Sequence, residues 1–141
     1  MTDKSAEQKD ERDLRTAGTL LSIESTALDD VTVLRVSGEV DVLTAPQLRA
    51  AIDDALAGND DRSARGIAVD LQAVTFLASS GLSVLGAEAR PNPQDRRIVI
   101  VANHSAVLRP MQLTGLVDLL TVCPTVAEAC AELRTARSET A

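Results

Sequence analysis

Short runs of β-branched apolar residues alternate with amphipathic stretches along most of this 141-residue chain. Residues 31–36, 66–71 and 98–102 have the length and composition of strands, whereas residues 44–57 repeat apolar side chains at helical spacing. Strands that alternate with helices form α/β domains, because right-handed crossovers lay successive strands side by side in parallel. The pattern predicts a single α/β domain with a mixed, mostly parallel sheet of about five strands and about four helices.

The individual elements follow from the same patterns and from turn residues. A tight turn at Asp29 and Asp30 joins the first two strands as a hairpin, which adds an antiparallel edge to the sheet. Residues 72–78 are read as a connection between a buried strand and the next helix. The strands are expected before Asp29 and at residues 31–40, 66–71, 98–102 and 119–123. The helices are expected at residues 44–57, 79–90, 105–116 and 125–137, with Pro110 inside the third and Val126, Ala127, Cys130 and Leu133 facing inward in the last.

The two ends of the chain differ from its middle. Residues 1–17 are polar and of mixed sign, which predicts a flexible polar tail. The folded domain is therefore expected at residues 18–136, with a flexible end at residues 137–141. At this length one hydrophobic core is expected.

Composition excludes several classes of function. Phe76 is the sole aromatic residue, and 14 Lys and Arg against 21 Asp and Glu give a net charge of −7. Proteins that bind nucleic acid use basic surfaces and aromatic stacking platforms, so nucleic acid is not expected as a partner. No apolar run reaches the roughly 18 residues of a membrane span and the first residues contain no signal-peptide segment, which predicts a cytoplasmic protein without membrane contact.

Motifs for catalysis and cofactor binding are missing from the sequence. The glycines form neither GxGxxG nor GxxxxGK[ST], so no nucleotide cofactor is expected. Cys123 and Cys130 are too few for a zinc site and are predicted to be reduced core residues. His104 is the sole histidine and the serines lack a GxSxG context, so no catalytic residue is assigned. A hydrolase or transferase that uses Ser79 or Ser80 with His104 as base stays as an alternative.

Two adjacent hydroxyl side chains, Ser79 and Ser80, stand where the second helix is expected to begin. One of them is expected to be the N-cap of that helix. The other, followed by Gly81, would present its hydroxyl at the surface, where a kinase could reach it. A phosphate there would be stabilised by the helix N-terminus but would disrupt an interface at that surface. The residues predict a binding switch and leave open which serine carries it.

Three stretches in order resemble the STAS domain family, and within it the bacterial anti-sigma factor antagonists. Residues 31–52 resemble the family's strand, Gly-Glu-Val-Asp turn and first helix, and residues 66–85 resemble its central strand and Ser-Ser-Gly-Leu segment. Residues 96–130 are similar to its closing half. The resemblance covers residues 19–134 and implies a STAS-type single domain.

The resemblance implies a non-enzymatic regulator that binds an anti-sigma factor of the GHKL serine kinase type and so releases a sigma factor. Phosphorylation by that kinase would end the binding and a phosphatase would restore it. The phosphoacceptor position falls on Ser79, with Ser80 as its neighbour. The implied partner-binding residues are Glu39, Asp41, Ala78, Ser79, Ser80, Gly81 and Leu82.

One residue departs from the family pattern. The family commonly has Asp before the acceptor serine, and this chain has Ala78. The alternative is a STAS ligand-sensing or regulatory-subunit module that phosphorylation does not switch, with redox control through Cys123 and Cys130 as one possible input. For such a control the two Cα atoms must lie within about 7 Å of each other.

Overall fold

A computed structural model of the chain describes residues 21–58, 66–90 and 97–140. The expected tail, residues 1–17, lies outside the described residues. The sheet has the strand order β3-β4-β5-β6-β7, in which β3 and β4 are antiparallel and the other neighbouring pairs are parallel. The strands are β3 (Leu21–Leu28), β4 (Val31–Val40), β5 (Gly66–Leu77), β6 (Ile98–Val101) and β7 (Thr121–Cys123). The predicted α/β fold with its antiparallel edge hairpin is confirmed.

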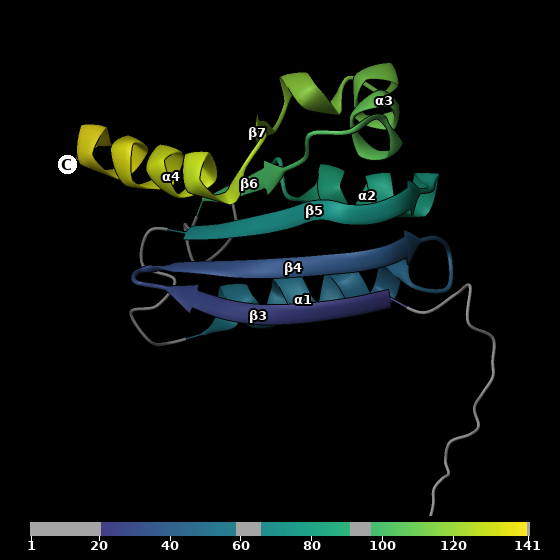
Figure 1. Ribbon diagram of the computed structural model, residues 1–141, viewed down its shortest axis with the longest axis horizontal. Helices are drawn as coiled ribbons and strands as arrows, with labels where there is room; N and C mark the ends of the chain where they lie inside the picture. Colours follow the sequence, from purple (N-terminus) through teal and green to yellow (C-terminus); the bar gives the residue numbers. More distant parts are fainter. Residues whose placement is uncertain (1–20, 59–65, 91–96, 141) are drawn as a thin grey trace, which may run out of the picture.

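The helices follow the strands in the predicted order and cover both faces of the sheet (Figure 1). Thr44, expected to be the first residue of the first helix, is its N-cap. The last helix continues to Thr140, past residue 136 where the domain was expected to end. The helices are α1 (Ala45–Ala57), α2 (Ser79–Ala87), α3 (Ser105–Leu113) and α4 (Val126–Thr140), with a short 3-10 helix η3 at Leu116–Asp118.

The expectation of a single core is wrong, because each face of the sheet has its own apolar cluster. Successive side chains of a strand point to opposite faces, so the buried strands feed both clusters. The larger cluster lies under α1, α2 and α3, and the smaller one lies under α4. In α4 the buried residues are Ala129, Cys130 and Leu133, whereas Ala127, expected to face inward, is exposed.

The strand β5 is longer than predicted and includes residues 72–77, which were expected to be a connection. Two register shifts between β4 and β5, at Arg35/Ser37 and at Gly38/Glu39, interrupt the regular pairing. Such irregularities break the two-residue alternation that marks a strand in the sequence. The longer strand carries the chain as far as the end of β4, where Val40 pairs with Leu77.

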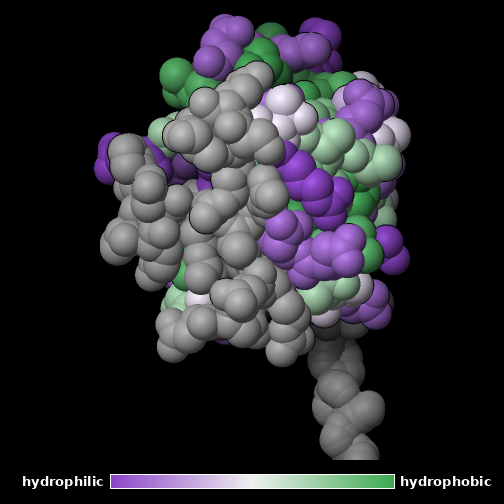
Figure 2. All heavy atoms as spheres, turned by 90° about the vertical axis from the view of Figure 1, so that its left-hand side faces the viewer, coloured by the Kyte–Doolittle hydropathy of each residue, from purple (hydrophilic) through white to green (hydrophobic). Residues whose placement is uncertain are grey.

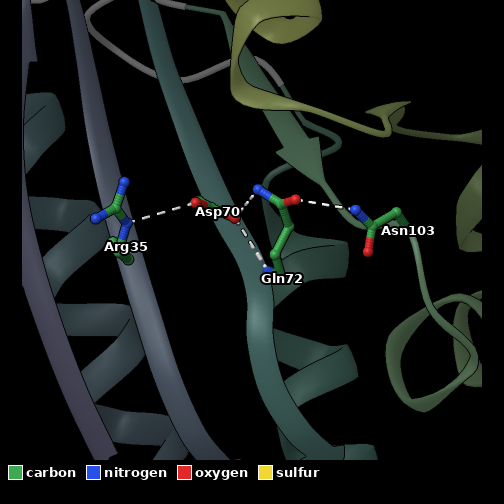
Figure 3. A network of polar contacts seen from close by, with 4 residues as sticks. All are labelled: Arg35, Asp70, Gln72 and Asn103. Atoms are coloured by element: carbon green, nitrogen blue, oxygen red, sulfur yellow. Dashed lines mark hydrogen bonds and ion pairs between the residues drawn. The ribbon is translucent and has the colours of Figure 1, made fainter.

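A polar network joins β4, β5 and the segment that follows β6 (Figure 3). Asp70 is buried, and its Oδ1 accepts hydrogen bonds from the backbone N–H and the side-chain amide of Gln72, each at 3.0 Å. Arg35 lies 3.7 Å from the other carboxylate oxygen, and Asn103 donates to Gln72 at 2.9 Å. Because both oxygens of Asp70 have polar partners, its charge is tolerated in the sheet.

Charged side chains meet at the amino-terminal end of the parallel strands. There the β3–β4 turn meets α4, since Arg134 lies 3.7 Å from Asp29 and 3.5 Å from Asp30. Figure 2 faces this end of the molecule, and its coloured surface includes a group of hydrophilic residues. The site described below lies at the opposite end of the sheet, because β4 and β5 run away from this turn (Figure 1).

Both cysteines lie in the α4 cluster, and their thiols are predicted to react slowly. Burial raises the pKa of the Cys123 and Cys130 thiols, so less of the reactive thiolate is present near neutral pH. We expect iodoacetamide to label both thiols promptly in unfolded protein and neither in native protein over the same time. Intact mass measures the labelling, and Cys123→Ala and Cys130→Ala assign it. Prompt labelling of the native protein would contradict the burial and would favour redox control.

Candidate functional site

The candidate site lies where β4 and β5 end side by side. Glu39 pairs with Phe76, and Val40 pairs with Leu77. One residue further, the backbone N–H of Ala78 donates to the carbonyl of Val40 at 2.8 Å. This bond fixes the start of the serine segment against the start of the Asp41 turn, so that two stretches almost forty residues apart in the sequence form one surface.

The Asp41 turn is held by its own side chains. Asp41 Oδ1 accepts hydrogen bonds from the backbone N–H groups of Leu43 at 2.9 Å and Thr44 at 3.1 Å. The buried hydroxyl of Thr44 accepts the N–H of Asp41 at 2.9 Å and donates to the carbonyl of Glu39 at 2.8 Å. Asp41 and Thr44 therefore fix the loop between β4 and α1, and the half-buried side chain of Asp41 has a structural role there.

The structure distinguishes the two serines. The expectation that one of them caps the helix is wrong, because Ala78 is the N-cap and Ser79 is already the first helical residue. Ser79 is exposed, whereas the hydroxyl oxygen of Ser80 is buried and has no hydrogen-bond partner among the described residues. The sequence could not distinguish the two serines, because their exposure depends on which face of α2 packs against the sheet. The hydroxyl that a partner can reach is that of Ser79.

Gly81 and Leu82 are placed to support the helix. A Cβ atom on Gly81 would lie 2.6 Å from Val40 Cγ1 and 2.7 Å from Leu77 Cδ1, so a larger residue there would push α2 off the strand ends. Leu82 is half-buried and packs against the larger core. Both were predicted to line a partner surface, and the contacts of both are with the strand ends and the larger core.

Three exposed apolar residues lie in the two stretches that meet at the candidate site and were missed as site residues by the sequence reasoning. Val42 and Leu43, in the Asp41 turn, are 73% and 71% exposed, and Phe76, near the end of β5, is 51% exposed. We call Val42, Leu43 and Phe76 the Ser79 rim. The sequence did contain a signal for an exposed apolar surface, because Val42 and Leu43 are adjacent apolar residues in a turn between Asp41 and the N-cap Thr44. Phe76 entered the sequence reasoning only as the sole aromatic residue. It was not assigned to a surface, because residues 72–78 were interpreted as a connection.

His104 is not placed as a base for the serines. Its Nε2 is hydrogen-bonded to the carbonyl of Val74 at 2.7 Å, and its Nδ1 is buried without a partner in the described part of the chain. No hydrogen bond joins it to Ser79 or Ser80 among the described residues, so the alternative of a hydrolase or transferase lacks its proposed base.

Residues 21–58, 66–90 and 97–140 contain no group of three or more His, Cys, Asp or Glu side chains arranged to hold a metal ion. None of their helices is long and apolar enough to cross a membrane.

Comparison with known proteins agrees with this fold. The family model described as "STAS domain" matches residues 22–129. The anti-sigma-F factor antagonist RsfB of Mycobacterium tuberculosis is 35% identical over 107 residues, which cover 76% of this chain and 84% of the relative. The anti-sigma-B factor antagonist of Staphylococcus aureus is 32% identical over 103 residues, covering 72% of this chain and 92% of that protein.

A solved structure agrees as well. The crystal structure of an anti-sigma factor antagonist from Mycobacterium paratuberculosis superposes with a TM-score of 0.73 at 34% identity, over 82% of this chain and 95% of that one. The chain therefore belongs to the STAS domain family, among the anti-sigma factor antagonists.

Proposed function

We propose that this protein acts in the cytoplasm by binding an anti-sigma factor of the GHKL serine kinase type, which releases a sigma factor, and that phosphorylation of Ser79 ends the binding. The observation that carries the proposal is the surface at the ends of β4 and β5. It combines one accessible hydroxyl, that of Ser79, with the exposed apolar Ser79 rim. A phosphatase would reverse the switch.

The chemistry of this surface suits a switch that acts without unfolding the domain. Burying the Ser79 rim against a partner removes apolar area from water, which favours association. A phosphate on Ser79 adds about −1.5 to −2 charge amid these apolar groups, and a partner would have to desolvate it. Within the chain, the free N–H groups in the first turn of α2 would tolerate that charge, because intrahelical bonds begin only with Leu82 N–H to Ala78 O.

Kinase treatment is expected to modify Ser79 alone. Incubation with the anti-sigma kinase and MgATP should add one phosphate to the native protein, while Ser79→Ala should accept none. Ser80→Ala is the matched control, since it removes a buried hydroxyl without a partner and should leave phosphorylation and stability nearly unchanged. Intact mass and peptide mapping measure the result. Phosphate on Ser80 would contradict the assignment.

Binding should follow the state of Ser79. We expect Ser79→Ala to bind the anti-sigma factor as tightly as the unmodified protein, and Ser79→Glu or the phosphoprotein to bind about tenfold more weakly or worse. Calorimetry measures both. If binding occurs but active kinase never changes the mass, Ala78 in place of an acidic residue removes the switch, and the chain is a regulatory module that phosphorylation does not control.

The apolar rim should contribute much of the affinity. Leu43→Ala and Phe76→Ala should each weaken binding about tenfold, because each truncates an exposed apolar side chain next to Ser79. Their thermal unfolding should change little, since neither side chain is buried. Leu28→Ala, at the end of β3 opposite the first residue of β4, is the matched control and should bind normally. Unchanged affinity in both rim variants would place the partner elsewhere.

A further inference from the structure

The outer edge of β3 has backbone groups that no described residue pairs with. This strand is first in the sheet order and pairs only with β4 within the described residues. The two-residue turn at 29–30 makes Leu28 and Val31 a hydrogen-bonded pair. Hydrogen-bonded and non-hydrogen-bonded pairs alternate along an antiparallel ladder, so every second residue of β3 is in a non-hydrogen-bonded pair. The N–H and C=O groups of Ile23, Ser25 and Ala27 therefore point away from β4.

One contact supports this orientation. The side chain of Gln47 in α1 donates to the carbonyl of Leu21 at 2.9 Å, so that an odd-numbered residue of β3 does face outward. Beyond Leu21 no hydrogen bond reaches the outward groups of Ile23, Ser25 or Ala27 from any described residue. Their side chains are half-buried or exposed, and β3 carries one charge, Glu24. Such an edge is a template for another strand.

A groove of about 450 Å³ runs beside this edge, between β3 and α1. Its strand side is formed by Ile23 and Ser25, and its helix side by Ala50, Ala51 and Asp54. Asp54 lies four positions after Ala50 and three after Ala51, so it shares a face of α1 with both. Their short side chains leave room next to the strand edge. Figure 1 shows α1 behind β3 and β4, with β3 at the margin of the sheet.

We propose that β3 and this groove receive an extended segment of a partner protein, which adds to β3 as a further strand. Recognition of this kind obtains affinity from main-chain hydrogen bonds and selectivity from pockets for alternate side chains. The side chains of the segment that enter the groove are apolar except for one basic residue, which the carboxylate of Asp54 attracts. Glu24, on the other face of β3, lies opposite Arg35 of β4, so that face adds no preference for a basic residue.

A second copy of this chain is a poorer occupant. Pairing of two β3 edges around a two-fold axis would bring the Asp54 residues of both copies to the same junction. Each copy also carries a net charge of −7. Like charges across an interface oppose association, so a basic strand from a different protein fits the edge better.

The test uses the full chain and a peptide of about eight residues, the length of β3, in which Val alternates with Thr and one groove-facing Val is replaced by Lys to meet Asp54. We expect the amides of Ile23, Ser25 and Ala27 to exchange rapidly with deuterium in the free protein and about tenfold more slowly with saturating peptide, as measured by NMR. A peptide with N-methylated backbone amides, which cannot form the ladder, should give no protection.

Variants test the edge and the groove separately. Ser25→Pro removes an N–H that faces away from β4, so the domain should keep its stability while peptide affinity falls about tenfold. Ser25→Thr is the matched control and should bind normally. Asp54→Lys should reverse the preference between the Lys peptide and a Glu peptide. Leu43→Ala in the Ser79 rim should leave peptide binding unchanged.

Three results would overturn the proposal. Slow exchange of the outward amides in the free monomer would mean that the chain's own residues cover the edge. Concentration-dependent dimers in sedimentation that disappear in Ser25→Pro would mean that a second copy covers it. Equal protection by the N-methylated peptide, or no protection by either peptide, would mean that the edge does not accept a strand.

Discussion

The hydrogen bond between Ala78 N–H and Val40 O is the contact on which the candidate site depends. It joins the ends of two parallel strands, and the absence of a side chain at Gly81 lets α2 begin directly over Val40 and Leu77. The Asp41 turn is rigid by itself through the bonds of Asp41 and Thr44. The main-chain bond brings this turn beside Ser79, and neither stretch forms the surface alone.

The two proposed binding surfaces differ in the chemical groups that they expose and in their place on the molecule. The end of the sheet near the β3–β4 turn carries the ion pairs of Arg134 with Asp29 and Asp30, whereas the Ser79 rim exposes apolar side chains at the other end. The edge of β3 differs from both, since it offers main-chain groups rather than side chains. A protein of this size can therefore carry a phosphorylation switch and a separate strand-docking edge, because the two use different elements.

The sequence predicted the alternation of strands and helices, the antiparallel hairpin and the serine segment, because each depends on local periodicity and turn chemistry. The sequence-based prediction of strand ends was wrong where pairing with a distant strand extends a strand beyond its regular alternation of apolar and polar residues. The register shifts beside Arg35 and Gly38 extend β5 through Phe76, although residues 72–78 lack a regular alternation. The same extension explains why Phe76 was not expected at the site.

What the sequence determined by itself was the α/β class, the order of the elements and the placement of two hydroxyls at the start of a helix. Its motifs also carried the family resemblance. Tertiary structure alone decided that Ser79 is exposed while the hydroxyl of Ser80 is buried, and that Asp41 is held by its own turn. The physical reason is that periodicity fixes which residues share a face of an element, whereas packing against other elements fixes which face meets water.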